Sequence, residues 1–323
     1  MQQYTNLHKI SLPLAVWLAN NEYDFEPSEK SISVTTLMRS VRQTVLTSRL
    51  EASGLGNLED ISNLLASRMG TAIHNGVEKA WVENAQECLE AIGVPAKVRN
   101  KIVVNPSEVS EGDLPVWLEL RTSKEIDGWN ILGCADMIMD GSVHDVKSTG
   151  TFAYLTGSMN NKYRLQLSMY AWLNPDKITE PMGYIQYIFK DWSKLEASFK
   201  SDYPQLPVLQ QPIPLLSNME TETYIRNKIK DLNFYWNSPQ EDIPLCSPED
   251  LWASKPKYQY RVKADAKKAS KNFDTMAEAN TWAASKGKGF VTYKAGKAKA
   301  CNYCAVRDTC NQYLSMKAQG TVD

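Results

Sequence analysis

The sequence lacks an excess of either charge, because 36 basic residues stand against 37 acidic ones and the formal net charge is -1. This balance excludes a globally basic protein that coats nucleic acid, although it leaves room for a local basic groove. No apolar run approaches the length of a membrane span, and the start, MQQYTNLHKI, lacks the basic-then-apolar layout of a signal peptide. We therefore expect no membrane contact and a location in the cytoplasm.

Internal repeats and low-complexity tracts are also missing, so the chain shows no sign of a repeat array or of disorder. Its 323 residues suffice for a catalytic domain with a small appendage, and 43% hydrophobic residues are ordinary for a globular protein. Beyond Pro239 the composition shifts toward lysine and small residues. We predict a domain over residues 1–238 and a smaller module over residues 239–323.

A long helix is predicted over residues 60–92, where apolar residues recur at helical spacing. The recurring positions are Leu64, Leu65, Met69, Ile73, Val77 and Trp81. Gly70 falls inside this pattern and marks either a break or a close approach of another element. His74 and Glu78 lie four residues apart, so a helix places both on one face.

Three β-strands follow, over residues 116–122, 129–139 and 142–148. Asp-Gly pairs join them at residues 127–128 and 140–141, and Asp-Gly between apolar segments is a strong signal of a hairpin. Asp136 and Asp145 therefore fall on neighbouring antiparallel strands. Their spacing across the second turn predicts that the two carboxylates meet near one end of that hairpin.

Helix and strand then alternate. Residues 161–173 (NKYRLQLSMYAWL) have the period of a helix, on which Gln166 and Tyr170 lie one turn apart. The segment MGYIQYIFKDW, residues 182–192, is typical of a strand, and a helix between strands indicates an α/β layered core. Residues 203–214 contain four prolines and are predicted to form a loop or an edge segment.

Hydrolysis of a phosphodiester requires an electrophilic metal, because the anionic backbone repels hydroxide and the leaving alkoxide must be stabilised. Asp136 and Asp145 offer the oxygen ligands that Mg²⁺ prefers, and His74 offers a nitrogen that also suits Mn²⁺. Lys147 lies two residues after Asp145, so a strand points both side chains to one face. There the lysine can orient or deprotonate the attacking water, or neutralise charge on the phosphate.

Four motifs carry a resemblance: Gly70-x3-His74, Gly133-x2-Asp136, Asp145-x-Lys147 and Gln166-x3-Tyr170. In this order and spacing they resemble the motifs of RecB-type PD-(D/E)XK nucleases, which include the nuclease parts of RecB and AddB and the CRISPR-associated exonuclease family. The resemblance covers roughly residues 30–190. It implies a restriction-endonuclease-like core, that is, a mixed sheet flanked by helices in the α/β class.

The resemblance also implies roles for single residues. It implies four ligands for Mg²⁺ or Mn²⁺, namely the side chains of His74, Asp136 and Asp145 and the backbone carbonyl of Val146. Lys147 would be the catalytic lysine, and Gln166 and Tyr170 would line the DNA side. Glu78 has no role in the family pattern, and we expect it to support His74 or the metal.

The same residues also have structural interpretations. Asp136 and Asp145 would then merely flank a turn, Lys147 would be a solvated strand residue, and Gln166 and Tyr170 would pack a helix on the sheet. The apolar surroundings of Asp136 in LGCADMIM weigh against this, because a carboxylate among apolar strand residues needs a partner for its charge.

Six cysteines are present, and three of them form the cluster Cys301-x2-Cys304-x5-Cys310. With Cys246 they supply the four thiolates of a tetrahedral zinc site or a [4Fe-4S] cluster, whereas Cys88 and Cys134 are expected to be ordinary buried residues. We expect the metal to staple a region that has few large apolar residues.

The C-terminal spacing resembles that of iron-sulfur members of the same nuclease branch, AddB and the CRISPR-associated exonucleases, and on that basis we favour [4Fe-4S] over Zn²⁺. In those relatives the fourth cysteine lies N-terminal to the nuclease core, beside a Cys-Pro-Arg segment. The corresponding stretch here, SVTTLMRSVRQTVL, contains no cysteine, so Cys246 would substitute for it.

The C-terminal part concentrates positive charge, with basic residues interleaved with aromatic ones. The basic residues are Lys255, Lys257, Arg261, Lys263, Lys267, Lys268, Lys271, Lys286, Lys288, Lys294, Lys297 and Lys299, and the aromatic ones are Tyr258, Tyr260, Phe273, Trp282, Phe290 and Tyr293. This combination suits a single strand, since cations bind the backbone and rings stack on bases. The alternative is a solvated surface. A helix near residues 274–285, started by Thr275-x-x-Glu278, and a strand at 290–293 are predicted there.

Together these features predict a metal-dependent DNA exonuclease acting on single strands or duplex ends. By family analogy it would act in bacterial or phage recombination and repair, beside a helicase or recombination protein. The sequence does not decide whether the protein forms an oligomer such as a ring. A non-catalytic DNA-binding or assembly module with the nuclease fold is the alternative. A zinc-stapled regulator, in which Asp145-x-Lys147 is accidental, is a third hypothesis.

Overall fold

The computed structural model describes residues 4–20, 30–54 and 59–322. They form two compact units. The sheet unit comprises Met1–Met38 and Leu58–Ile229, and the cysteine unit comprises Arg39–Asn57 and Lys230–Asp323. None of the described helices is long and apolar enough to cross a membrane.

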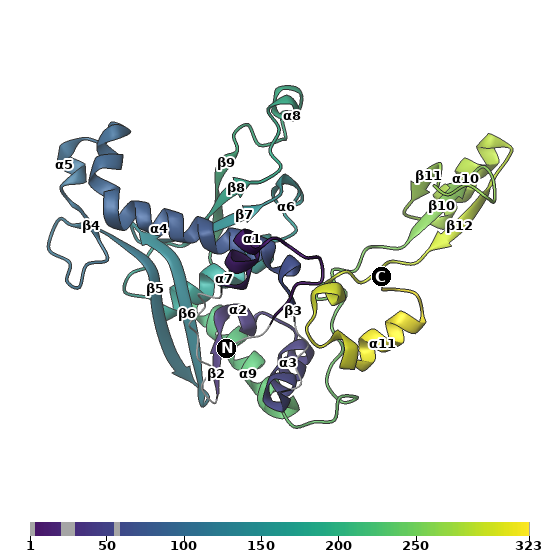
Figure 1. Cartoon of the computed structure of the whole chain (residues 1–323), viewed down its shortest axis with the longest axis horizontal. Helices are drawn as coiled ribbons and strands as arrows, with labels where there is room; N and C mark the ends of the chain where they lie inside the picture. The colour runs from purple at the N-terminus through teal and green to yellow at the C-terminus, as the bar shows by residue number, and fades with distance from the viewer. Residues whose placement is uncertain (1–3, 21–29, 55–58, 323) are drawn as a thin grey trace. The chain divides into compact units, whose positions relative to one another are not determined.

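The sheet unit is built on a mixed seven-stranded sheet, ordered β4-β5-β6-β7-β8-β9 with β2 added against β6 (Figure 1). The strands are β2 (Ser31–Ser33), β4 (Ile102–Val104), β5 (Leu114–Ile126), β6 (Trp129–Met139), β7 (Ser142–Thr149), β8 (Met182–Phe189) and β9 (Val208–Pro214). Three neighbouring pairs are parallel and three are antiparallel. The coarse prediction of an α/β fold is confirmed.

Both predicted hairpins are present. Asp127 and Gly128 join β5 to β6, and Asp140 and Gly141 join β6 to β7. All four residues have positive φ, between 48° and 76°, as the two central residues of a type I′ turn require. The Asp-Gly signal therefore located both turns and fixed the registers of the strands on either side.

The helices of this unit include α1 (Leu12–Ala19), α2 (Val34–Leu37), α4 (Leu65–Ala91), α5 (Ala96–Arg99), α6 (Thr151–Thr156), α7 (Asn160–Leu173), α8 (Lys194–Phe199) and α9 (Asn218–Tyr235), the last of which continues into the cysteine unit. The predicted helix over residues 60–92 corresponds to a 3-10 turn, η1 (Ile61–Leu64), followed by α4. Gly70 does not interrupt α4, and a Cβ there would meet nothing within 4 Å. A short pair of strands, β1 (Tyr4–Thr5) and β3 (Glu59–Asp60), precedes η1.

Helices cover the sheet, and the core between them is aliphatic. Val77 and Trp81 of α4 pack against Val116, Leu118 and Met137 of the first hairpin (Figure 1). Helix α7 contacts five of the strands, from β5 to β9, and most of its residues from Tyr163 onward are buried. The apolar stripe of α4 and the apolar body of α7 explain why both helices bind the sheet.

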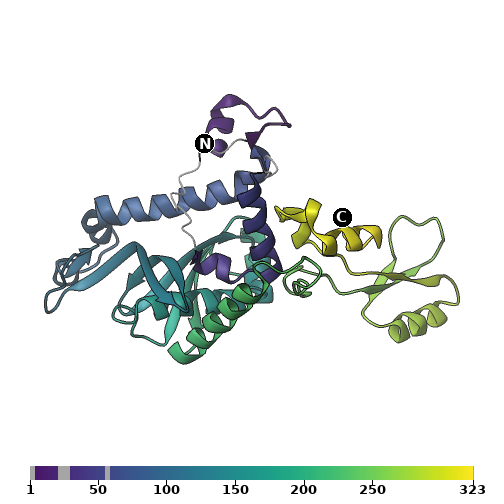
Figure 2. The same cartoon turned by 90° about the horizontal axis from the view of Figure 1, so that it is seen from below.

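The cysteine unit contains α3 (Val41–Ser53), a three-stranded sheet in the order β11-β10-β12, and a compact C-terminal segment (Figure 2). Its other elements are β10 (Lys257–Arg261), β11 (Lys271–Phe273), α10 (Met276–Lys286), β12 (Phe290–Lys294), η2 (Ala300–Tyr303), η3 (Arg307–Thr309) and α11 (Asn311–Ala318). The predicted capping box at the start of α10 is confirmed: Thr275 and Glu278 bind each other's backbone N–H.

Two arginines of α3 explain why residues 39–57 group with the C-terminal part. Arg42 is 1% exposed and donates to the carbonyl of Ile243 at 2.7 Å, and it also contacts Asn311. Arg49 donates to the carbonyls of Trp236 and Ser238 just beyond α9. Sequence alone assigned α3 to the domain over residues 1–238, a boundary that remains a prediction.

Candidate functional site

The central strand of the sheet unit has a fork on one edge. At its start β6 pairs with β2 through Asn130–Leu132, and at its end it pairs with β7 through Met137–Met139. Between them lie residues 133–136, for which neither β2 nor β7 provides a pairing partner. Asp136 therefore sits at the point where β7 leaves β6.

The predicted meeting of Asp136 and Asp145 is explained by this fork. The last pair of the β6–β7 ladder is Met137 with His144, so the next register position would oppose Asp136 to Asp145. Instead of continuing the ladder, the Asp136 carboxylate accepts a hydrogen bond from the backbone N–H of Val146 at 2.8 Å. The side chain thereby satisfies a backbone donor that the diverging strands leave open.

Gly133 is required by the close approach of α7. A Cβ at this position would collide with Leu173 and lie 3.3 Å from the ring of Tyr170. Because glycine has no side chain, α7 can lie directly against β6. This contact brings Gln166, on the same helix, to the base of the fork.

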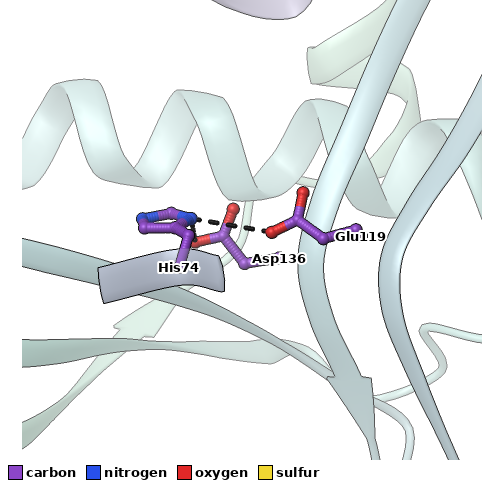
Figure 3. A group of neighbouring side chains, drawn as sticks. All are labelled: His74, Glu119 and Asp136. Carbon is purple, nitrogen blue, oxygen red and sulfur yellow. Dashed lines mark ion pairs between the residues drawn. The ribbon is translucent and has the colours of Figure 1, made fainter. Parts of the chain in front are cut away.

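His74 enters the site from α4. Its Nε2 lies 3.0 Å from the carbonyl oxygen of Val146, which can only accept, so Nε2 carries a proton. Its Nδ1 lies 3.5 Å from Asp136 Oδ2 and 3.7 Å from Glu119 Oε1. Figure 3 shows the three side chains pointing toward one another.

Glu119 is a member of the site that sequence reasoning missed. It lies in β5 opposite Asp136, between the paired positions Leu118–Met137 and Leu120–Ala135, but is not itself paired with β6. Its φ of 45° is a left-handed conformation that is costly for a non-glycine residue and is often found at functional sites. The signal was available, because Glu119 is an acid among apolar strand residues, as Asp136 is.

Asp145 and Lys147 form a second layer of the site. Asp145 is 1% exposed, and Lys147 Nζ lies 2.6 Å from its Oδ2. The other carboxylate oxygen accepts a hydrogen bond from Gln166 at 3.0 Å, and Gln166 also donates to the hydroxyl of Tyr170. Asp145 is thus held on both sides, and the predicted common face of Asp145 and Lys147 is confirmed.

Burial and neighbouring charges shift the pKa values of Asp136, His74 and Glu119. Burial and the nearby Asp145 raise the pKa of Asp136 to about 7. The hydrogen bond with Glu119 raises the pKa of His74 to about 9, with further help from Asp136. Burial would raise the pKa of Glu119, but hydrogen bonds from His74 and Cys134 outweigh it and leave the pKa lowered.

The pKa of Lys147 is raised as well. Burial opposes its charge, yet Asp145 and Asp136 outweigh burial, so the ammonium is charged at neutral pH. A metal would bind the state in which His74 is neutral and Glu119, Asp136 and Asp145 are all ionised. In that state the three carboxylates exceed the single charge of Lys147 by two negative charges, which one divalent cation would balance.

The ligand atoms that converge are those of His74, Glu119 and Asp136, which all lie within 4.8 Å of one another. The predicted ligands are therefore brought together in part. Asp145 is adjacent but engaged by Lys147 and Gln166. The Val146 carbonyl, also predicted as a ligand, accepts from His74 here.

Gln166, Tyr170 and Glu78 lie at positions that differ from those predicted from the sequence. Gln166 and Tyr170 are 7% and 5% exposed, so the structure places them beneath Asp145 rather than on a DNA-facing surface. Burial raises the pKa of the Tyr170 hydroxyl far above its usual value, which keeps it neutral. Glu78 is half-buried on α4 and is not a member of the converging group, where Glu119 supplies the carboxylate instead.

The four clustered cysteines of the cysteine unit are close enough to influence one another. Burial and the charges of Cys304, Cys246 and Cys310 raise the pKa of the Cys301 thiol to about 11. The sulfur of Cys246 also lies 3.2 Å from the hydroxyl of Ser40, at the start of α3. Ser40 belongs to the stretch in which the resemblance placed a missing cysteine.

The two other cysteines depart from the expected burial. Cys88 is exposed on α4. Cys134 is half-buried and donates to Glu119 at 3.3 Å, so it supports the site. Burial and the Glu119 charge raise the pKa of Cys134 to about 12, which keeps the thiol protonated as a donor.

Comparison with known proteins adds little to this geometry. No protein-family model matches the chain, and no curated protein matches it. Among solved structures, a crystal structure of SSO0001 is similar, with 19% sequence identity and a TM-score of 0.43 over 72% of this chain and 92% of that one. A likeness at this level supports neither a family nor a function for the chain.

Proposed function

We propose that this chain is a metal-dependent DNA nuclease with a RecB-like PD-(D/E)XK core, and that it acts as an exonuclease. One observation carries the proposal: at the fork of the sheet, His74, Glu119 and Asp136 converge beside the Asp145–Lys147 pair. A set of three carboxylates, a histidine and a charged lysine has little structural use, because burying it costs free energy.

The residues fit a hard divalent cation. Asp136 is largely buried, its carboxylate is crowded by Asp145, and oxygen ligands with one imidazole suit Mg²⁺ or Mn²⁺. His74 would bind through Nδ1, since Nε2 donates to Val146. A bound cation would supply an electrophile that polarises the phosphate and favours ionisation of the attacking water.

The protein groups around that position have separate tasks. A charged Lys147 has no lone pair, so it cannot take a proton and instead orients the water and neutralises charge on the phosphate. Asp145 holds Lys147, and Gln166 holds Asp145. Gln166 is therefore a positioning residue in this proposal.

The test is digestion of linear, end-blocked and circular DNA with Mg²⁺, with Mn²⁺ and with EDTA. The expected result is metal-dependent loss of linear DNA with open ends. Lys147→Met and Asp136→Asn should each lower the rate by at least about 100-fold. Lys190→Met, at an exposed turn, is the matched control and should leave the rate unchanged.

Retention of cleavage by both site variants would reject the proposal. DNA binding with no cleavage under any metal would instead match a non-catalytic module with the nuclease fold. Digestion of circular DNA would support the nuclease proposal but would show that the enzyme is an endonuclease and not an exonuclease.

We further propose that Cys246, Cys301, Cys304 and Cys310 bind a [4Fe-4S] cluster. The spacing of Cys301, Cys304 and Cys310 supports this choice, because it resembles that of the iron-sulfur members of the RecB-like nuclease branch. A tetrahedral Zn²⁺ site, which also takes four thiolates, is the alternative. Iron content and visible absorbance near roughly 400 nm test the choice, and stoichiometric zinc would reject it.

A further inference from the structure

A small part of the cysteine unit carries a large net positive charge, with 12 of the 36 basic residues of the protein and 3 of its 37 acidic ones. Residues 255–299, which we call the basic module, contain 12 basic and 3 acidic residues, a net charge of +9. The whole chain has a net charge of -1, so the remaining residues sum to -10. A charge separation of this size within one chain is the footprint of a surface that attracts a polyanion.

The acids of the basic module do little to reduce this charge. Asp274 pairs with Lys257, which lowers the pKa of Asp274. Glu278 caps the start of α10 by accepting from the backbone of Thr275. The third acid, Asp265, is exposed on the loop between β10 and β11, where Lys263, Lys267 and Lys268 are exposed as well and outnumber it.

Several aromatic residues form the core of the basic module. Register places Tyr258, Tyr260, Phe273 and Tyr293 on one face of the three strands. Helix α10 covers this face: the Phe273 and Trp282 rings are 6.0 Å apart, and Ala279 of α10 and Tyr260 of β10 are buried (Figure 2). Lys271 lies over Trp282 at 3.7 Å from the ring centre. Tyr260, Phe273 and Trp282 are therefore engaged in packing, whereas Tyr293 is 62% exposed, so the base-stacking role predicted from sequence is left to few of the rings.

The opposite face of the three strands is polar. Register places on it Lys257, Gln259, Arg261, Asn272, Thr292 and Lys294, with Phe290 as its aromatic residue. Gln259 donates to Asn272 at 3.1 Å, and Arg261 donates to Gln259 at 3.0 Å. These bonds hold a guanidinium and two amides in a row across β11 and β10.

A groove follows this polar face. Its volume is about 800 Å³, and its lining includes Gln259, Arg261, Lys267, Lys268, Asn272 and Lys294. A second depression, of about 370 Å³, adjoins it through Gln259, Asn272 and Lys294 and adds Lys255 and Lys257. The two together make a basic channel lined with hydrogen-bonding side chains.

We propose that the basic module binds duplex DNA, with its polar face in the major groove. The outer axes of three strands about 4.8 Å apart are about 10 Å from each other, and a major groove about 12 Å wide admits a two-stranded β-ribbon, so two of the three strands can enter it with their side chains. Arginine and carboxamide side chains pair with base edges in that groove, while flanking lysines bind the phosphates. A single strand would require a succession of exposed stacking faces, and here two of the six rings, Phe290 and Tyr293, line the groove, whereas Tyr260, Phe273 and Trp282 pack together under α10.

This inference concerns binding and stands apart from the proposed hydrolysis. The test uses the full chain in EDTA, with fluorescence anisotropy on a labelled duplex of about 20 base pairs and on each of its single strands, over a series of salt concentrations. The variant Lys267→Ala/Lys268→Ala removes two charges from the groove. The control Lys286→Ala/Lys288→Ala removes two exposed charges of the same module, one on α10 and one just after it.

The duplex is expected to bind more tightly than either strand. The groove variant should weaken duplex binding about 10-fold at fixed salt and reduce the salt slope by about 2, while the control changes affinity by less than about 2-fold. Equal loss in both variants, or tighter binding of a single strand, would overturn the inference. EDTA prevents cleavage, so this assay measures binding by itself. If the chain binds duplex DNA in this way but does not cut DNA in the separate digestion with Mg²⁺ or Mn²⁺, only the nuclease proposal is rejected.

Discussion

The two units of this protein differ in the kinds of side chain that they bury. The sheet unit buries aliphatic side chains completely, among them Ile131, Ile138, Leu167 and Ile185, and its helices close over the sheet. The cysteine unit also buries aliphatic side chains, such as Val45 and Ile243, but it adds an arginine, Arg42, and the cysteine Cys301. The core of the first unit surrounds one polar site, whereas the core of the second unit itself contains a guanidinium bonded to a backbone carbonyl, and the proposed cluster would add a cross-link there.

The largest effect should come from removing a cysteine ligand. Cys301→Ala is expected to lose iron and visible absorbance and to make residues 230–323 sensitive to protease, because binding a structural metal contributes on the order of 10 kcal/mol in small metal-dependent domains. Limited proteolysis with mass spectrometry measures this, and fragments of the sheet unit should persist. Cys88→Ala, at an exposed cysteine, is the control. Unchanged protease resistance would place the stability of both units in their apolar cores.

A cysteine at position 40 should be able to replace the proposed ligand Cys246. The Ser40 hydroxyl lies 3.2 Å from the Cys246 sulfur, so a thiol at position 40 would reach the proposed cluster. Cys246→Ala should lower iron content strongly, and Ser40→Cys/Cys246→Ala should regain most of it. The loss of the Ser40 cap on Gln43 costs only about 1 kcal/mol. Ser33→Cys/Cys246→Ala is the matched control, since Ser33 caps α2 in the same manner, and its recovery of iron would contradict the prediction.

The buried arginine gives the next largest change. Arg42→Met should destabilise the cysteine unit by about 3 kcal/mol, because the carbonyl of Ile243 loses a charged donor in the interior. Denaturant unfolding followed by hydrogen exchange in each unit would measure it. Arg307→Met, at a half-exposed position, should cost less than about 0.5 kcal/mol. An equal loss of protection in both units would show that they unfold as one.

Two glycines of the sheet unit should respond in opposite directions. Gly133→Ala forces Leu173 and Tyr170 of α7 away from β6 and should cost about 2 kcal/mol. Gly70→Ala, in the interior of α4 with open space around it, should stabilise by about 0.5 to 1 kcal/mol. Thermal unfolding of the two variants checks both signs, and a loss at Gly70 would mean that another segment approaches α4 there.

The smallest expected effect is a pH dependence of the local stability of residues 4–20, at the start of the sheet unit. Hydrogen bonds from Ser62 and Leu7 hold the pKa of Asp60 well below its ordinary value of 3.8. A lowered pKa in the folded state favours the carboxylate, so this stabilisation is present above pH 3.8 and is lost as the pH falls below it. Hydrogen exchange of residues 4–20 should therefore quicken, relative to the intrinsic rate, below that pH in the wild type. In Asp60→Asn the exchange should already be fast at neutral pH, and a pH-independent wild type would exclude Asp60 as the cause.

Local patterns in the sequence were sufficient for much of the fold. The Asp-Gly turns, the apolar stripe of α4 and the capping box of Thr275 and Glu278 all appear where the spacing predicted them, because each depends on residues only a few positions apart. The pairing of Lys147 with Asp145 followed from the two-residue period of a strand.

The rest depended on contacts between distant residues. Glu119 joins His74 and Asp136 through a left-handed backbone conformation within a strand, which no propensity predicts. Gln166 turned inward to hold Asp145, and the aromatic rings of the basic module turned toward α10. Each outcome depends on which face of an element a neighbour covers, and spacing within one segment does not contain that information.

The sequence by itself determined the elements, their turns and the residue types available for metal, phosphate and thiolate chemistry. Only the tertiary structure decided which of them meet. The fork of β2 and β7 on β6 selects Glu119 beside His74 and Asp136, and the packing of α3 with the C-terminal segment brings Ser40 to Cys246. Contacts of this kind link residues 17 to 206 positions apart, and their geometry is set by the packing of whole elements rather than by local periodicity.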